Sequence, residues 1–215
     1  QDFLAGAARE FGLWIVGGTI PLHSPEPGRP YSACCVWDET GRRVGRYDKI
    51  HLFDVRVPGS NEAYRESHRT TAGAEPLVLN SPFGRLGVAV CYDLRFPELY
   101  RNQVVRSATV ITLPSAFTAA TGKDHWEPLV RARAIENQVY VIAPDQRGLS
   151  TPKLAWHGRS MIVDPWGVVL AQAPDRECCI VADVDLEAQQ QIRTRLPSLA
   201  HSRASVYEPG ESSRE

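Results

Sequence analysis

The sequence predicts an α/β fold in which helices cover a sheet of mixed strand direction. Three observations support this prediction: short apolar runs bounded by turn residues, helical segments that follow some of these runs, and tight turns between others. Strand followed by helix and strand favours buried parallel pairs, and the tight turns add antiparallel pairs. With 215 residues, of which 43% are hydrophobic, the chain is long enough for one domain with its own core.

The expected strands are short runs rich in apolar and β-branched residues. Runs of this composition fit the pleated, half-buried surface of a sheet. We expect nine of them, at residues 13–20, Tyr31–Trp37, Arg43–Asp48, 86–90, 108–113, 139–143, 159–163, 168–171 and 179–184.

Three segments are predicted to be helical: Asp2–Phe11, 96–107 and 124–138. The last two follow strands. The third repeats apolar residues at offsets of three, four and eight, which places them on one helix face. These residues are Trp126, Leu129, Val130 and Ala134.

Turns and loops complete the organisation. Residues 38–41 and 164–167 each contain the Gly or Pro of a tight reversal between strands. The polar segment 51–73 has little periodicity and exceeds the usual length of a connector, so we expect an active-site loop there. One domain is expected over residues 1–207, followed by a polar tail at 208–215. Because the chain opens without Met inside a predicted helix, we expect its N-terminal part to be incomplete.

Composition excludes several classes of partner. The 24 Lys and Arg residues balance 25 Asp and Glu residues, so the net charge of −1 provides no attraction to nucleic acid or to an anionic membrane. No run approaches the roughly 20 apolar residues of a membrane span, and the start lacks the pattern of a signal peptide. We therefore expect a cytoplasmic protein that binds neither nucleic acid nor membrane.

The five cysteines divide into two adjacent pairs and one single residue. Both pairs, Cys34-Cys35 and Cys178-Cys179, occur in apolar strand-like runs and are predicted to be reduced core thiols. The single residue is Cys91.

Cys91 is predicted to stand where a buried strand meets a helix that has Pro97 in its first turn. At that edge of a sheet a side chain is exposed, and the N–H groups of the helix start point toward it. Such a setting stabilises a thiolate or an oxyanion, so Cys91 is a candidate nucleophile. The alternative is a small side chain that packs in the core.

Two charged residues support the nucleophile interpretation. Lys49 ends a strand-like run, and its ammonium group near Cys91 would lower the thiol pKa and neutralise an oxyanion. Glu66, in the same polar segment, could orient that ammonium group or relay protons. Taken singly, each could also be an ordinary exposed charge. Glu127 is typical of an acid at a helix start, because Thr121 and Asp124 give capping-box spacings around it.

Other chemistries have weaker support. Neither cysteine pair has the spacing of a zinc site, and Gly17-Gly18 lacks the rest of a phosphate-binding motif. A Cys–His hydrolase stays open because histidines are available, although the local patterns of the known cysteine protease families are absent. The candidate histidines are His51, His125 and His157.

Three motifs together resemble those of the nitrilase superfamily of carbon–nitrogen hydrolases. The amino-acid sequence around Glu66 and over residues 131–138 is most similar to that of the Nit amidases, and among these to the deaminated glutathione amidases. The resemblance covers nearly the whole chain. Its motifs are Lys-Ile-His-Leu-Phe-Asp at 49–54, Cys-Tyr-Asp-Leu-Arg-Phe-Pro-Glu at 91–98, and Pro-Ser-Ala-Phe at 114–117 with His-Trp-Glu at 125–127.

The resemblance implies an α-β-β-α sandwich that pairs with a second copy as a homodimer, and a Glu-Lys-Cys triad that needs no metal or cofactor. Cys91 matches the nucleophile, Lys49 the oxyanion-stabilising lysine and Glu66 the additional glutamate of the family. The backbone N–H of Tyr92 is the expected second oxyanion donor. The implied substrate is a small-molecule amide of a 2-oxo acid, with four expected binding residues: Arg95, Thr121, Lys123 and Glu127.

One departure concerns the family's general-base glutamate, which lies at the end of an early strand. No glutamate of this chain matches it, because Glu10 lies in a predicted helix, Glu26 in a Pro/Gly-rich loop and Glu39 in a turn. We expect a chain that lacks the N-terminal strand rather than a degenerate enzyme, and little activity from these 215 residues alone. The alternatives are an omega-amidase that acts on 2-oxoglutaramate and a non-catalytic binding or regulatory copy.

Overall fold

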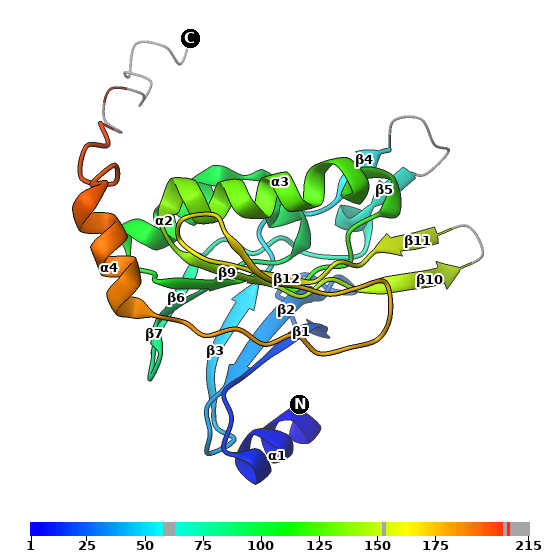
Figure 1. Ribbon diagram of the computed structural model, residues 1–215. Coiled ribbons are helices and arrows are strands. Elements are labelled where there is room, and N and C mark those ends of the chain that lie inside the picture. The colour runs from blue at the N-terminus through cyan, green and yellow to red at the C-terminus, as the bar shows by residue number, and fades with distance from the viewer. Residues whose placement is uncertain (58–62, 152–153, 204–205, 207–215) are drawn as a thin grey trace.

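The chain folds into four layers, helix, sheet, sheet and helix, which confirms the predicted sandwich (Figure 1). The computed structural model describes residues 1–57, 63–151, 154–203 and 206. Its elements, in chain order, are α1 (Asp2–Phe11), β1 (Ile15–Leu22), β2 (Tyr31–Trp37), β3 (Arg43–Asp48), β4 (Asp54–Arg56), β5 (Ala63–Arg65), the 3-10 helix η1 (Glu66–His68), β6 (Leu77–Ser81), β7 (Gly84–Val88), the 3-10 helix η2 (Cys91–Arg95), α2 (Pro97–Val105), β8 (Val110–Thr112), α3 (Ala119–Asn137), β9 (Tyr140–Ala143), β10 (Arg147–Thr151), β11 (Leu154–His157), β12 (Met161–Val163), β13 (Val169–Gln172) and α4 (Leu186–Arg195).

The smaller sheet has the order β1-β2-β3, with antiparallel neighbours, and α1 covers its outer face. Successive residues of β2 point to opposite faces, as strand geometry requires. Cys35 and Trp37 pack with Ala8 of α1, whereas Cys34 and Val36 face the main core between the sheets. All of these side chains are buried, so the first cysteine pair consists of core thiols as predicted.

The larger sheet has the order β13-β12-β9-β8-β7-β6. Its central strands β7, β8 and β9 are parallel, and α2 and α3 connect them on the outer face (Figure 1). Trp126, Val130 and Ala134 of α3 are fully buried, which confirms the predicted apolar face. Parallel pairing with both faces covered explains why these strands are rich in buried apolar residues. Their carboxyl ends meet at one edge, where the candidate residues follow them.

The last predicted strand, at residues 179–184, is wrong. The chain there forms no strand, Val181 is 85% exposed, and both Cys178 and Cys179 are exposed. The β-branched run lacked a neighbour with which to form a ladder, and propensity alone does not make a strand. The prediction that this second pair consists of core thiols is therefore also wrong.

Several short elements escaped prediction. The expected loop at 51–73 contains β4, β5 and η1, and β6, the β10–β11 hairpin and α4 were also missed. α3 begins at Ala119 rather than at residue 124, with Thr118 as its N-cap, so Glu127 is not a helix-start acid. The predicted tail at 208–215 lies outside the described residues. None of the helices described is long and apolar enough to cross a membrane.

Candidate active site

A cavity of about 1070 Å³ opens at the carboxyl ends of β3, β7, β8 and β9. Lys49 follows β3, Cys91 follows β7, Ser115 follows β8 and Asp145 follows β9, and all four line the cavity. Glu66 lines it from the segment at 51–73, as expected of an active-site loop. Strand ends that converge at one edge of a sheet are a frequent place for a binding site. The structure therefore brings the three predicted catalytic residues into one cavity.

Cys91 occupies a strained turn at the start of η2, with a φ of 47°. This left-handed conformation is unfavourable for a residue with a Cβ, by about 1 kcal/mol or more, and surrounding contacts must hold it. The Cys91 N–H donates to the Pro114 carbonyl oxygen at 3.0 Å, and its Sγ lies 3.8 Å from the Ala116 carbonyl oxygen. The N–H of Tyr92 belongs to the first turn of η2, where N–H groups precede the intrahelical hydrogen bonds.

Lys49 and Glu66 form an ion pair in the cavity wall. The Lys49 side chain is almost entirely buried, and its Nζ donates to Glu66 Oε2 at 2.5 Å. The same carboxylate oxygen accepts the Phe53 backbone N–H at 2.7 Å, which fixes the glutamate in place. A buried ammonium group requires such a partner to stay charged. Lys49 is thus held in the wall of the cavity that Cys91 also lines.

The pKa of the Cys91 thiol is raised from its ordinary value, because burial disfavours the thiolate. The Lys49 charge and the contact with the Ala116 carbonyl group act in the opposite direction, but burial is the larger effect. The sequence-based expectation of a lowered thiol pKa is therefore wrong in its net direction, although the influence of Lys49 has the expected sign. The thiol needs a proton acceptor before it can attack a substrate.

Asp145 is a residue of the cavity wall that sequence analysis missed. It is 8% exposed, its Oδ1 accepts the Phe117 N–H at 2.8 Å, and its buried Oδ2 has no hydrogen-bond partner among the residues that the structure describes. Burial raises the pKa of the Asp145 carboxyl group to about 7, against the hydrogen bonds from backbone N–H groups. The one signal in the sequence that could have identified Asp145 is its position directly after a buried strand, where side chains reach the edge of the sheet.

The expected substrate-binding residues are not gathered at Cys91. Lys123 and Glu127 are exposed on α3 and line a separate hollow of about 510 Å³. Thr121 Oγ1 lies 2.8 Å from Thr118 Oγ1, in the first turn of the same helix. The structure thus places these three residues outside the lining of the Cys91 cavity, and their contacts with a substrate stay a prediction.

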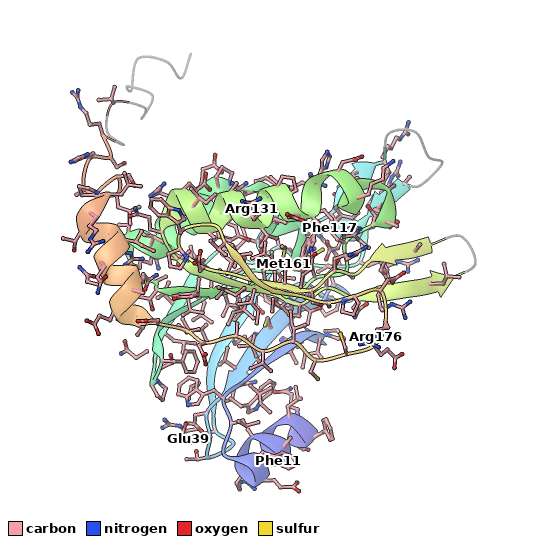
Figure 2. The ribbon with its side chains drawn as sticks, viewed as in Figure 1. Phe11, Glu39, Phe117, Arg131, Met161 and Arg176 are labelled. Atoms are coloured by element: carbon pink, nitrogen blue, oxygen red, sulfur yellow. The ribbon has the colours of Figure 1, made fainter. Side chains whose placement is uncertain are left out.

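Arg95 also lies outside the residues that line the cavity. Its guanidinium group is 3.2 Å from His125 Nδ1 and lies over the Phe117 ring, 5.1 Å from the centroid. Phe117, labelled below α3 in Figure 2, packs in turn on Trp126. Among the residues that the structure describes, the basic side chains that line the cavity are Lys49 and, at its exposed rim, Arg65, His68 and Arg69.

The histidines considered for a Cys–His hydrolase lie away from the cavity lining. His51 Nδ1 is 2.7 Å from Asp93, and His125 contacts Arg95. His157 packs against Gly122 of α3. The structure thus places none of these three histidines in the cavity lining, whereas Lys49 and Glu66 line the cavity together with Cys91.

The site thus combines a partly buried cysteine at a strand–helix turn with a lysine–glutamate ion pair, on an α-β-β-α sandwich, and this arrangement is typical of a hydrolase. Comparison with known proteins identifies the family. The family model for carbon–nitrogen hydrolases matches residues 1–194, and the chain belongs to that family.

Named relatives agree with this assignment. The chain is 43% identical over 204 residues to a deaminated glutathione amidase of Synechocystis sp., covering 94% of this chain and 75% of the relative. It is 37% identical over 205 residues to the omega-amidase NIT2 of Homo sapiens, covering 95% and 73% of the two chains. The crystal structure of the C. elegans NitFhit protein superposes with a TM-score of 0.87 at 39% identity, over 96% of this chain and 50% of that one. Saccharomyces cerevisiae Nit3, of the nitrilase superfamily, gives a TM-score of 0.81 at 33% identity over 91% of this chain and 68% of that one.

Proposed function

We propose that this carbon–nitrogen hydrolase cleaves the terminal amide of a small 2-oxo acid, with deaminated glutathione as its preferred substrate, and releases ammonia. The observation that supports this most strongly is the buried Lys49–Glu66 ion pair in the same cavity as the Cys91 thiol. A fixed cation beside a nucleophile stabilises the negative charge that forms on a carbonyl oxygen under attack.

In the proposed reaction the Cys91 Sγ attacks the amide carbon while the thiol proton passes to a general base. The oxyanion of the tetrahedral intermediate is stabilised by Lys49 Nζ and the Tyr92 N–H. The same acid–base group then protonates the amide nitrogen, and the C–N bond breaks to release ammonia and leave a thioester. Water, deprotonated by that group, hydrolyses the thioester and regenerates the thiol, so one difficult step becomes two easier ones.

The general base is expected to be a carboxylate, as in the family. The glutamates weighed from the sequence lie elsewhere: Glu10 is in α1, Glu26 pairs with Arg29, and Glu39 is in the turn between β2 and β3. Figure 2 shows Glu39 near α1, far from the helices that cover the larger sheet. None of these glutamates lines the cavity, as the sequence led us to expect.

The substrate proposal rests on the relatives named as deaminated glutathione amidases and on the charge of the cavity rim. Arg65 and Arg69 at the rim can hold a carboxylate of the substrate by charge-assisted hydrogen bonds. The second candidate, an omega-amidase, is favoured by the similarity to proteins of that name and uses the same triad.

Ammonia release distinguishes these candidates when it is measured on protein expressed from the complete coding sequence, which is expected to supply the general base. We expect a higher kcat/KM for deaminated glutathione than for 2-oxoglutaramate, and none above background for Cys91→Ser with either compound. The reverse preference would identify the omega-amidase. Release of ammonia by Cys91→Ser at the wild-type rate, or by neither protein, would contradict the proposal.

We also propose that the protein forms a homodimer. Ile135 of α3 lies against Gly167, and the neighbouring Trp166 and Val168 are 59% and 51% exposed, which gives an apolar patch on the outer helical layer. Light scattering after gel filtration tests this, with Trp166→Glu expected to shift the dimer toward monomer. A cytoplasmic location stays a prediction that cell fractionation can check.

A further inference from the structure

The carboxylate of Asp93 is fully buried and joins two segments that are far apart in the sequence. Its Oδ2 accepts hydrogen bonds from the Tyr47 hydroxyl at 2.7 Å and from the Val90 N–H at 2.8 Å. Its Oδ1 accepts from the His51 N–H at 3.2 Å and contacts His51 Nδ1 at 2.7 Å. Four contacts to one carboxylate satisfy most of its acceptor capacity in the core.

These contacts surround the two reactive side chains. Tyr47 and His51 are each two residues from Lys49, and Val90 directly precedes Cys91. The His51 ring also stacks on Phe96 at the end of η2, with centroids 3.6 Å apart and planes within 5° of parallel. The end of β3 is therefore joined to the Cys91 turn by both hydrogen bonds and ring contact.

The other tethers of Lys49 lie on its own side of the cavity. Its Nζ is bound to Glu66, its N–H donates to the Ser32 carbonyl oxygen at 3.0 Å, and its carbonyl oxygen accepts from the Gly73 N–H at 2.8 Å. None of these contacts reaches the Cys91 turn. Phe53, whose N–H donates to Glu66, does contact Tyr92 through its ring, with centroids 4.9 Å apart. The junction at Asp93 adds hydrogen bonds between the Lys49 segment and the Cys91 turn, and so constrains the separation between the ammonium group and the thiol.

We propose that Asp93 is a positioning residue that fixes Lys49 relative to Cys91, a role that rests on the proposed amidase function. Charge-assisted hydrogen bonds are short and directional, so a buried carboxylate with four contacts holds its neighbours to within a narrow range of geometry. Small errors in such geometry reduce rates strongly, whereas the binding of a substrate elsewhere in the cavity is little affected.

The test is Asp93→Asn, which keeps the side-chain volume but replaces one acceptor by a donor that faces other donors. We expect kcat for amide hydrolysis to fall about tenfold or more, with KM within about twofold. We also expect alkylation of Cys91 by iodoacetamide, followed peptide by peptide in mass spectrometry, to slow about three- to tenfold at pH 7.5, because Lys49 no longer favours the thiolate. The exposed Cys178 and Cys179 serve as internal standards whose alkylation rates stay unchanged.

Asp38→Asn is a matched control. Asp38 is 5% exposed and likewise accepts four hydrogen bonds, from Thr40 and Arg42, in the turn between β2 and β3. We expect Asp38→Asn to lower the free energy of unfolding about as much as Asp93→Asn does, and to leave the alkylation rate of Cys91 unchanged. An equal effect of Asp38→Asn on Cys91 would show that general destabilisation is responsible, and would overturn the proposal.

A double variant tests whether Asp93 acts through Lys49. In a Lys49→Ala background, Asp93→Asn should not slow Cys91 alkylation further. A full additional effect there, or no effect in the wild-type background, refutes the positioning role. Alkylation needs no substrate, so this outcome is independent of whether the proposed amide is hydrolysed. If Asp93→Asn does not fold, Tyr47→Phe removes one of the four contacts and should act in the same direction.

Discussion

Replacing Asp145 by Asn should stabilise the protein at alkaline pH and have little effect in acid. Burial moves the pKa of this carboxyl group from 3.8 to about 7, a difference of about three units. At about 1.36 kcal/mol per unit, ionisation of Asp145 lowers the free energy of unfolding by about 4 kcal/mol. Relaxation of the protein around the charged carboxylate reduces this loss, so we expect about 2–4 kcal/mol. Asn keeps the acceptor for the Phe117 N–H and cannot ionise.

The sign follows from the raised pKa. The folded state binds the proton more tightly than the unfolded state, so the stabilising contribution is complete below about pH 4 and is lost as the pH rises to about 7. Above pH 7 the folded protein carries the full cost of a buried, ionised carboxylate. The free energy of unfolding of Asp145→Asn minus that of the wild type should therefore rise between pH 4 and pH 7 and then level off.

Urea unfolding at half-unit steps from pH 4 to pH 8.5 measures this difference. Asp164→Asn is the control for removing one negative charge, because Asp164 caps a turn through the N–H groups of Trp166 and Val168 rather than lying in the cavity wall. A difference between Asp145→Asn and wild type that stays constant over this range would refute the reasoning, because a buried carboxyl group that ionises near pH 7 cannot give that result.

Three further predictions concern the ion pair and the packing of α3. Lys49→Ala should lower kcat by about a hundredfold or more in the ammonia-release assay, because it removes an oxyanion donor, and near-normal turnover would exclude that role. Glu66→Gln should lower kcat by about tenfold or more, since the Lys49 ammonium loses its charged partner, and an unchanged value would make the pair dispensable. Gly122→Ala should cost about 1–3 kcal/mol of unfolding free energy in a urea titration, because its Cβ would lie 2.3 Å from His157. Gly6→Ala in α1 is its control, where a Cβ meets open space and should stabilise the helix by about 0.5–1 kcal/mol.

The sequence predicted correctly those elements that depend mainly on residues close to one another in the chain. The strands Tyr31–Trp37 and Arg43–Asp48 match residue for residue, because the composition of each run agrees with the Gly41 turn that joins them. The apolar run before Cys91 likewise predicted a buried strand that ends in a turn, although the strand itself stops at Val88. Here sequence pattern, turn chemistry and burial all favour the same structure.

The features that the sequence did not predict depend on contacts between residues far apart in the chain. Asp93 lies only two residues before Arg95 in the sequence, but its carboxylate is occupied by Tyr47, His51 and the Val90 N–H. The helix start was misplaced because two capping patterns around Asp124 suggested it, whereas the backbone is already helical from Ala119. No window of sequence contains both partners of such contacts, so neither the junction at Asp93 nor the burial of Asp145 could be predicted from spacing.

Burial has two opposite effects on the proposed chemistry. It raises the pKa of the Cys91 thiol above its ordinary value despite the nearby Lys49, so the resting site holds a neutral thiol. The same low dielectric strengthens the attraction of Lys49 for any oxyanion that forms beside it, and the ion pair with Glu66 holds the lysine in place until then. The cation therefore contributes more to the charge that develops on the substrate than to a preformed thiolate. A neutral thiol beside the Lys49 ammonium group favours transfer of the thiol proton during attack on the amide carbon. A neutral thiol is also less readily oxidised, because oxidation requires the thiolate.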